Sequence, residues 1–311
     1  MRIIFMGSPT FAVHPLEALV AAGHEVVAVV TQPDRPAGRQ RHLTAPPVKV
    51  AAQRLGLPIL QPPTLRDTAV VEALSALRPD VGVVAAYGEI LRPNVLAIPP
   101  LGYLNIHPSL LPLHRGPAPV AGAILAGDRQ TGVTIMRLDR GMDSGPIVRQ
   151  VRTDLAPDAY AGPLTDELFV VGAKLLVEAL AEYAAGRIVP QAQEHERASL
   201  TRMLKKEDGL VDWSQSAIQI ERMIRAYDPW PGVQTSWRGQ AVRLLRAAVL
   251  NVGDATATPG QLISQSGQRY PLVATGSGAL ELRELQPAGK RPMDGAAWLA
   301  GLREREGCFG A

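Results

Sequence analysis

The sequence predicts an α/β fold: a mostly parallel sheet covered by helices on both faces, followed by a smaller β-barrel or sandwich. In the first half of the chain, apolar strand patterns alternate with helical patterns, which is typical of parallel strands joined by crossover helices. After Gly186 the pattern changes to a polar stretch and then to short strands separated by glycine, proline and asparagine. A chain of 311 residues is long enough for two such domains.

Valine- and isoleucine-rich runs bounded by turn residues predict the strands of the first half. In order, these are Arg2–Met6, Glu25–Thr31, Ile59–Leu60, Val81–Ala86 and Tyr103–Ile106, then Gly132–Leu138 and Ile147–Arg152 as a pair around a turn. Apolar residues at three- and four-residue spacing predict the helices. These are Phe11–Ala22, Val48–Leu55, Thr68–Leu77, Val120–Ala126 and Leu164–Ala185. Gly23 and Gly56 follow the first two helices, as glycine commonly does where a helix ends.

The second half begins with a polar, irregular stretch over residues 187–206, whose composition is that of a linker. A helix is predicted over Ala217–Ala226, and short strands rich in valine and leucine follow it. The predicted strands are Gln240–Leu250, Gly260–Ser264, Pro271–Ala274 and Ala279–Leu285. The turn residues between them favour a small barrel or sandwich.

Composition excludes several classes of protein. Hydrophobic residues make up 46% of the chain and charged residues 20%, as in globular proteins. No apolar run reaches the roughly 18 residues that a membrane-spanning helix needs. The chain begins with a strand rather than a leader segment, and its single cysteine, Cys308, cannot form an internal disulfide. We therefore expect a cytoplasmic protein without a membrane partner.

The net charge of +3 arises wholly from residues 200–311, which hold 14 Lys or Arg and 11 Asp or Glu. Such a surplus permits a polyanionic partner without demanding one. No C-x-x-C or H-E-x-x-H motif is present in the sequence, so no metal is expected. Only Gly7 of a dinucleotide-binding fingerprint follows the first strand, and Pro9 removes an amide donor, so a nicotinamide cofactor is not expected either.

Two stretches carry the candidate chemistry. Asn105–Gly116 reads NIHPSLLPLHRG, and Asp139–Pro146 reads DRGMDSGP. Together they place an amide, an imidazole and a carboxylate among glycines and prolines. Each residue alone has an ordinary explanation, because a lone Asn or Asp often forms a turn and a lone His often lies satisfied in a core or at the surface.

The first stretch marks the end of a strand. Pro108 cannot donate to a sheet ladder and favours an extended residue before it, so the strand should end at this point. Asn105 and His107 are two residues apart and therefore point to the same side. Ligands of open parallel sheets bind outside the carboxyl ends of the strands. At that edge Asn105 can donate to a developing oxyanion, and His107 can handle a proton.

NIHPSLLPLHRG followed by a D-x-G-x-D-x-G segment resembles the core of the formyltransferases that use 10-formyltetrahydrofolate as formyl donor. The resemblance implies a triad of Asn105, His107 and Asp143. It also implies folate contacts from the loop Ser109, Leu110, Leu111 and Pro112, and on the pterin side from backbone groups around Ala86, Tyr87, Gly88 and Asp139.

In formyl transfer an amine attacks the formyl carbon, so negative charge develops on the formyl oxygen. Asn105 would meet that charge. Two roles stay open for His107, a second donor to the oxyanion or an acceptor of the amine proton. Asp143 would orient or charge-stabilise His107, or accept a proton through a water, and we favour the first. Arg115 is expected to anchor its loop, with a substrate contact as the alternative.

Further segments resemble the branch of this family that formylates an aminoacyl-tRNA. They are Thr31–Arg39, Leu204–Trp213, Ile224–Trp230 and Leu285–Lys290. The resemblance implies a Rossmann-like catalytic domain over residues 1–186, a linker over 187–206 and an OB-like tRNA-binding domain over 207–311. The implied acceptor is the α-amino group of methionine on initiator tRNA, for translation initiation, and we expect a monomer.

Basic residues of a loop and of the linker are the expected RNA contacts. They are Arg35, Arg39 and Arg41 in the turn-rich segment from Gln32 to Pro47, and Lys205 and Lys206 in the linker. The loop departs from the family, which commonly has G-x-K-K where this chain reads Gln40-Arg41-His42. Two alternatives remain: a formyltransferase acting on a small amine such as an amino-sugar nucleotide, and a folate- and RNA-binding protein without activity.

Overall fold

The computed structural model describes residues 1–37, 42–250, 257–264 and 267–310. The chain divides into two compact units. The first comprises Met1–Pro119, Gln130–Asp154 and Thr165–Thr201, and the second comprises Val120–Arg129, Leu155–Leu164 and Arg202–Ala311.

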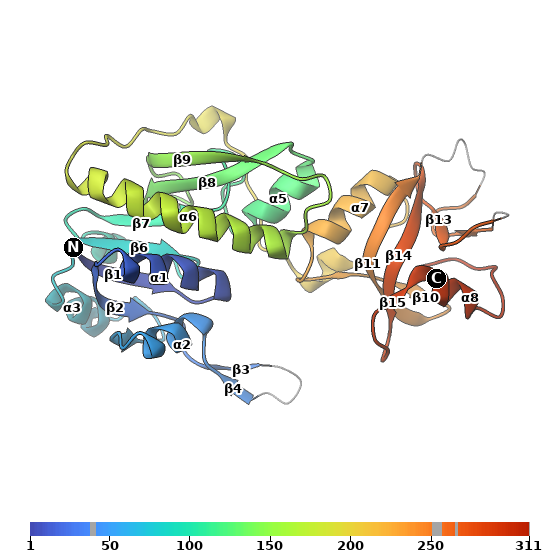
Figure 1. Ribbon diagram of the computed structural model, residues 1–311, viewed down its shortest axis with the longest axis horizontal. Coiled ribbons are helices and arrows are strands. Elements are labelled where there is room, and N and C mark those ends of the chain that lie inside the picture. The colour runs from blue at the N-terminus through green and yellow to red at the C-terminus, as the bar shows by residue number, and fades with distance from the viewer. Residues whose placement is uncertain (38–41, 251–256, 265–266, 311) are drawn as a thin grey trace. The chain divides into compact units, whose positions relative to one another are not determined.

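The first unit is built on a seven-stranded sheet with the order β5-β2-β1-β6-β7-β8-β9 (Figure 1). The first five strands in that order are parallel, β8 is antiparallel to β7, and β9 is antiparallel to β8. The bounds are β1 Arg2–Gly7, β2 Glu25–Val30, β5 Ile59–Leu60, β6 Val81–Ala85, β7 Tyr103–His107, β8 Gln130–Arg137 and β9 Ile147–Asp154. This is the mostly parallel, Rossmann-like sheet that the sequence predicts.

Helices lie on both faces of this sheet. They are the 3-10 turn η1 Thr10–Ala12, α1 Val13–Ala21, α2 Pro47–Arg54, α3 Thr68–Ala76, α4 Pro93–Leu96 and α6 Ala161–Ala184, whose first residues belong to the second unit. Gly172 of α6 lies against Ile106 of β7, because a Cβ at Gly172 would come within 2.7 Å of the Ile106 side chain. Successive residues of a strand point to opposite faces, so Asn105 and His107 face away from α6.

The core on the face away from α6 is apolar and buried. It joins side chains of β1, β6 and β7 to Leu74 of α3 and Val95 of α4. Tyr103, at the start of β7, lies directly over Gly82 of β6, where a Cβ would be only 2.0 Å from the tyrosine ring. Glycine at this position therefore lets the large aromatic ring cross the neighbouring strand.

The second unit contains an antiparallel sheet with the order β10-β11-β14-β13-β12, and β15 pairs with β14. The bounds are β10 Val233–Trp237, β11 Gln240–Leu250, β12 Leu262–Ile263, β13 Leu272–Ala274, β14 Ala279–Pro287 and β15 Met293–Asp294. Its helical elements are α5 Pro119–Ala126, whose first residue belongs to the first unit, η3 Lys206–Gly209, α7 Ala217–Ala226 and α8 Gly295–Ala300. A capping box formed by Ser216 and Gln219 begins α7.

The C-terminal segment joins the two edge strands of this sheet. The Phe309 N–H donates to the Gly260 carbonyl just before β12, at 2.7 Å, and the Gly310 N–H donates to the Ser236 carbonyl of β10, at 2.9 Å. The Phe309 ring packs into an aromatic cluster with Trp213, Trp237 and Trp298. The result is an antiparallel half-barrel, in agreement with the small barrel that the sequence predicts.

Several elements go beyond the sequence prediction. The turn-rich segment contains a hairpin of β3 Arg35–Ala37 and β4 His42–Thr44. The short helix α4 was not predicted because it has too few residues for a periodic pattern. The strand β10 was not predicted because it has polar residues, Gln-Thr-Ser, between its two buried ends. Residues 187–201, which read as part of a linker, pack within the first unit and contain a 3-10 turn η2 His195–Arg197. None of the helices in the described ranges combines the length and apolar character that crossing a membrane requires.

Replacing Gly82 by Ala should destabilise the protein by about 1–3 kcal/mol, because the added methyl group overlaps the Tyr103 ring in a packed core. Urea unfolding followed by circular dichroism measures the change. Gly301→Ala is the control, since a Cβ there would be 3.5 Å from the nearest atom and should change stability by less than about 0.5 kcal/mol. Equal midpoints for the Gly82 variant and the parent would show that the core can move away from the methyl group.

Candidate active site

Asn105 and His107 lie at the carboxyl end of β7, as the sequence predicts. β7 continues one residue beyond the predicted end, because His107 pairs with Thr134 of β8. Pro108 then stops the strand. The same edge of the sheet carries the carboxyl end of β6, where Ala86 and Gly88 have positive φ angles of 50° and 92° and turn the chain sharply.

A cavity of about 240 Å³ lies at this edge of the first unit. Asn105 and Asp143 line it together with residues 84, 86–91 and 138–142. The predicted pterin-side residues Ala86, Tyr87, Gly88 and Asp139 are therefore all in its wall. The Asn105 side-chain amide makes no hydrogen bond to any described residue, so its donors are available to a ligand.

His107 is 4% exposed, and its surroundings fix which ring nitrogen carries the proton. Nε2 lies 3.0 Å from the carbonyl oxygen of His114, which can only accept, so Nε2–H is the donor. Burial lowers the pKa of His107, and this outweighs the Asp143 carboxylate and the bond to the His114 carbonyl, which both raise it. At neutral pH the imidazole is therefore neutral, and Nδ1 carries a lone pair.

Asp143 faces that lone pair. Its Oδ2 lies 3.7 Å from Nδ1 of His107 and accepts a hydrogen bond from the Gly116 N–H at 2.7 Å. Asp143 has a φ angle of 49°, in the left-handed region that residues with side chains seldom adopt. Gly116 has a φ angle of 101°, and a Cβ there would be 2.5 Å from the Thr201 carbonyl oxygen, so the site needs glycine. The two sequence motifs thus meet through one hydrogen bond.

The predicted folate loop, Ser109–Pro112, lies beside His107 but does not line the cavity. Ser109 is fully buried, and its hydroxyl donates to the Leu113 carbonyl at 2.7 Å. Leu111 is also buried, and the Thr134 hydroxyl donates to the Ser109 carbonyl at 2.7 Å. These side chains hold the loop, so the groups that it can offer to a ligand are mainly those of the backbone.

Arg115 anchors its loop through Gln193, a residue that the sequence analysis did not single out. Its guanidinium donates to the Gln193 side-chain oxygen from Nε at 3.0 Å and from Nη2 at 2.7 Å. Gln193 is buried, although the polar stretch around it reads as a linker. Its Nε2 donates to the carbonyls of Asp143 and Gly145, at 2.8 and 2.7 Å. A single buried glutamine in a polar segment gives no periodic signal in the sequence.

The predicted RNA-binding residues are distributed over both units. Arg35 lies in the first unit, is exposed, and donates from Nη2 to the Gln32 side-chain oxygen at 3.0 Å. Lys205 and Lys206 are exposed in the second unit, at the start of η3. Arg39 and Arg41 lie outside the described residues.

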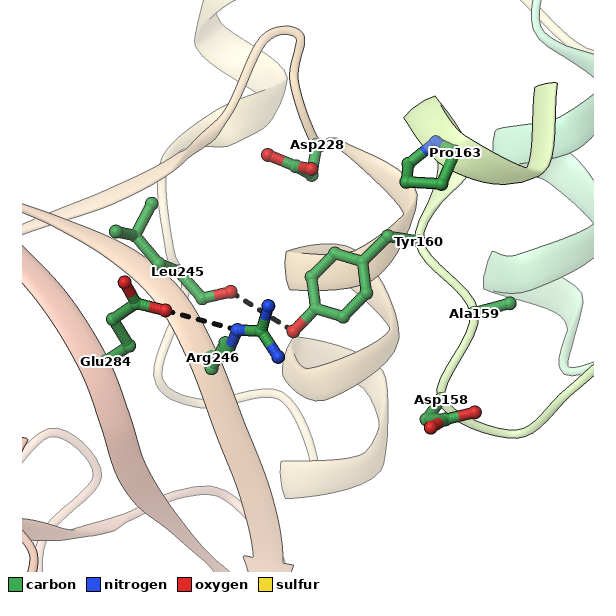
Figure 2. A pocket seen from close by; sticks show the side chains of 8 residues that line it. All are labelled: Asp158, Ala159, Tyr160, Pro163, Asp228, Leu245, Arg246 and Glu284. Atoms are coloured by element: carbon green, nitrogen blue, oxygen red, sulfur yellow. Dashed lines mark hydrogen bonds and ion pairs between the residues drawn. The ribbon is translucent and has the colours of Figure 1, made fainter. Parts of the chain in front are cut away.

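A second cavity, of about 420 Å³, lies within the second unit between the segment Asp158–Pro163 and β11. Figure 2 shows two interactions within it: the Tyr160 hydroxyl donates to the Leu245 carbonyl at 3.2 Å, and Arg246 pairs with Glu284 at 3.1 Å. It is the larger cavity, but we assign the chemistry to the smaller one, because only that one combines a free amide donor with a carboxylate next to a buried imidazole. Among the described residues no cluster of His, Cys, Asp or Glu could hold a metal ion.

Comparison with known proteins defines the class. Residues 1–180 match the family described as formyl transferase, and residues 203–303 match its C-terminal domain. The chain therefore belongs to the formyl transferase family. The methionyl-tRNA formyltransferase of Chloroflexus aurantiacus is 68% identical to it over 97% of this chain and 97% of that protein. The enzyme of the same name from Chloroflexus aggregans is 68% identical, over 98% of this chain and 99% of that protein.

A solved structure shares the fold at low identity. The N-formyltransferase from Helicobacter canadensis, solved in complex with folinic acid and dTDP-3-aminofucose, matches with a TM-score of 0.65 and 16% identity. The match covers 93% of this chain and 99% of that chain. At that identity the likeness supports the fold alone. It does not indicate which amine accepts the formyl group in this chain.

We expect the His107 imidazole to titrate below its ordinary pKa of 6.5, because burial disfavours its charged form. Asp143→Asn should lower the midpoint further, since it removes the carboxylate that favours the imidazolium. Proton–carbon NMR of the histidine ring, assigned with a His107→Asn variant, measures both values. A midpoint above 6.5, or one that rises in the Asp143 variant, would contradict the neutral, buried state assigned to His107.

Proposed function

We propose that this chain is a methionyl-tRNA formyltransferase, which moves the formyl group of 10-formyltetrahydrofolate to the α-amino group of methionyl initiator tRNA. One observation carries the chemistry: an unbonded Asn105 amide lines the same cavity as Asp143, whose carboxylate faces the buried His107. The high identity to enzymes of that name, over nearly the whole length of both chains, supports the acceptor.

Asn105 is proposed to stabilise the negative charge that develops on the formyl oxygen. The folate supplies a formyl group on its N10, and the acceptor supplies a neutral amine. The Asn105 backbone is fixed on a strand, and its amide has no partner among the described residues, so it breaks no bond to those residues when it donates to the oxygen. A donor placed in advance in this way accelerates the reaction more than one that must move.

His107 is proposed to take the proton that the attacking nitrogen loses and to pass it to N10 of the folate, as the bond between N10 and the formyl carbon breaks. Its Nε2–H is held by the His114 carbonyl, which leaves Nδ1 as the basic atom. In the neutral ring Nδ1 has no proton to donate to Asp143, but the carboxylate, 3.7 Å away, is close enough to stabilise the imidazolium once Nδ1 is protonated. We therefore assign Asp143 to setting the charge state of His107, the role that the sequence analysis favours.

The folate is proposed to bind in the 240 Å³ cavity. Val84, Leu91 and Leu138 give it apolar walls, while the turns at Ala86–Gly88 and Asp139–Asp143 present backbone groups. A flat heterocycle with polar edges fits such a lining. The backbone of Ser109–Pro112, beside His107, is proposed as a further contact.

The tRNA is proposed to contact Arg35, Arg39 and Arg41 of the loop and Lys205 and Lys206 near η3. Arg35 and the two lysines are exposed, as phosphate-binding groups must be. We further propose that the enzyme acts as a monomer in the cytoplasm, where initiator tRNA is used.

The test is a formylation assay with purified protein, 10-formyltetrahydrofolate and methionine-charged initiator tRNA, alongside charged elongator tRNA and an amino-sugar nucleotide. We expect rapid formylation of the initiator only. Turnover of the amino-sugar nucleotide without formylation of either tRNA would overturn the proposal that tRNA is the acceptor. The roles proposed for the catalytic residues would still stand. Folate binding without transfer to any acceptor would overturn the catalytic roles.

Asn105→Ala should lower kcat by about 10²–10³-fold, the usual cost of removing one oxyanion donor. Thermal stability and tetrahydrofolate affinity should change little, because the amide bonds no described residue. Steady-state kinetics, differential scanning calorimetry and titration calorimetry measure the three quantities. Near-full turnover in the folded variant would remove Asn105 from the mechanism.

Replacing Lys205 and Lys206 together by Ala should raise KM for the tRNA and leave kcat nearly unchanged. The slope of log affinity against log salt should fall by about two, because two phosphates of the tRNA are no longer neutralised. Filter binding over a range of salt concentrations measures the slope. Lys174→Ala, which removes an exposed charge from α6, is the control and should leave the slope unchanged. An unaltered slope in the double variant would exclude these lysines as phosphate contacts.

A further inference from the structure

We propose that Gln193 is a positioning residue for formyl transfer: its side-chain amide, held by Arg115, fixes the Asp143 turn so that the carboxylate faces His107. This inference rests on the function proposed above. Neither Gln193 nor Arg115 lines the cavity, so both would act through Asp143 and not on a substrate.

The Gln193 amide is bonded at both ends. Its Nε2 donates to the carbonyl oxygens of Asp143, at 2.8 Å, and Gly145, at 2.7 Å. Its Oε1 accepts from Nε of Arg115 at 3.0 Å and from Nη2 at 2.7 Å. An amide suits these four contacts because it has two N–H donors at one end and an acceptor at the other. The side chain therefore has one orientation that satisfies all its partners.

The loop that contains Arg115 also holds the side chain of Asp143. The residue after it, Gly116, donates its N–H to Oδ2 of Asp143 at 2.7 Å. The Arg115 backbone is itself held, because its N–H donates to the Ser199 carbonyl at 2.9 Å and its carbonyl accepts from the Thr201 N–H at 2.7 Å. Asp143 is thus fixed at its carboxylate through the Arg115 loop and at its main chain through Gln193.

The Asp143 turn needs such support. Residues 140–142, which precede it, are exposed, and Asp143 has the unfavourable φ angle of 49°. By contrast, Gln193 is 5% exposed and Arg115 is 7% exposed. A buried polar network that is held by several hydrogen bonds has fewer arrangements than an exposed turn. We infer that the network sets the distance between Asp143 and His107.

Two substitutions separate this role from simple packing. Gln193→Met keeps the length of the side chain and removes all four hydrogen bonds. Gln193→Glu keeps the contacts to Arg115 but turns a carboxylate oxygen towards two carbonyl oxygens, which repel it. Glu194→Gln is the matched control, because it alters the next residue and breaks only the exposed ion pair with Arg197.

In the full-length protein, each Gln193 variant should lower kcat for initiator tRNA by about 10–100-fold, the effect of a small misplacement of a reacting group. KM for both substrates should change little. The His107 titration midpoint, measured by NMR, should fall towards that of Asp143→Asn as the carboxylate moves away. Among the described residues, the titratable groups that act on His107 are Asp143 and His114. The Glu194 variant should match the parent in every measurement.

A double-mutant cycle gives the decisive readout. If Gln193 acts only through Asp143, adding Gln193→Met to Asp143→Asn should cost no more than about a further twofold in kcat. Losses that multiply in the double variant would overturn the proposal, because they would show a role independent of Asp143. If the Met variant does not fold, the Glu variant, which retains the bonds to Arg115, is tested in the same cycle.

The outcomes separate this inference from the proposed function. Absence of formylation by the parent enzyme would overturn the function. The His107 titration needs no turnover, so it still tests whether Gln193 positions Asp143. An unchanged His107 midpoint in folded Gln193 variants would overturn the positioning role even if the parent formylates initiator tRNA rapidly.

Discussion

The hydrogen bond from the Gly116 N–H to Oδ2 of Asp143 is the contact on which the candidate site depends. It joins two segments that are 27 residues apart and brings a carboxylate to 3.7 Å from the His107 ring. A hydrogen bond to a charged acceptor contributes about 1.5–3 kcal/mol to stability. Gly116 is required because the Thr201 carbonyl occupies the space that a Cβ would fill. The local backbone and the segment packed on it thus decide where the carboxylate stands.

The second constraint is the burial of His107 at the end of a strand. The alternation of β7 sends Ile106 towards α6 and His107 towards the opposite face, so the packing of the sheet also aims the imidazole. Burial lowers its pKa, and the His114 carbonyl selects the proton on Nε2. A neutral imidazole with a defined lone pair therefore results from packing and one backbone bond.

Much of the fold could be predicted because its main elements have clear local patterns. Val81–Ala85 is a continuous apolar run, and the long helix over Ala161–Ala184 repeats apolar residues at helical spacing. The elements that escaped prediction lack such a pattern. The strand Val233–Trp237 is polar at its centre, and the bonds from Phe309 and Gly310 that join the half-barrel's edges depend on residues distant in sequence. Arg39 and Arg41 lie outside the described residues, so their predicted contacts stay predictions.

The amino-acid sequence alone was enough to predict where Asn105 and His107 lie in the fold. Pro108 ends the strand, and the two-residue spacing of Asn105 and His107 puts them on one side, because these rules act over a few bonds of the chain. What surrounds those residues became known only from the folded chain. Folding turned the Ser109 side chain into the core and placed Gln193 against the Asp143 turn, 50 residues away. Contacts between distant segments depend on how the whole chain packs, and residue spacing carries no information about them.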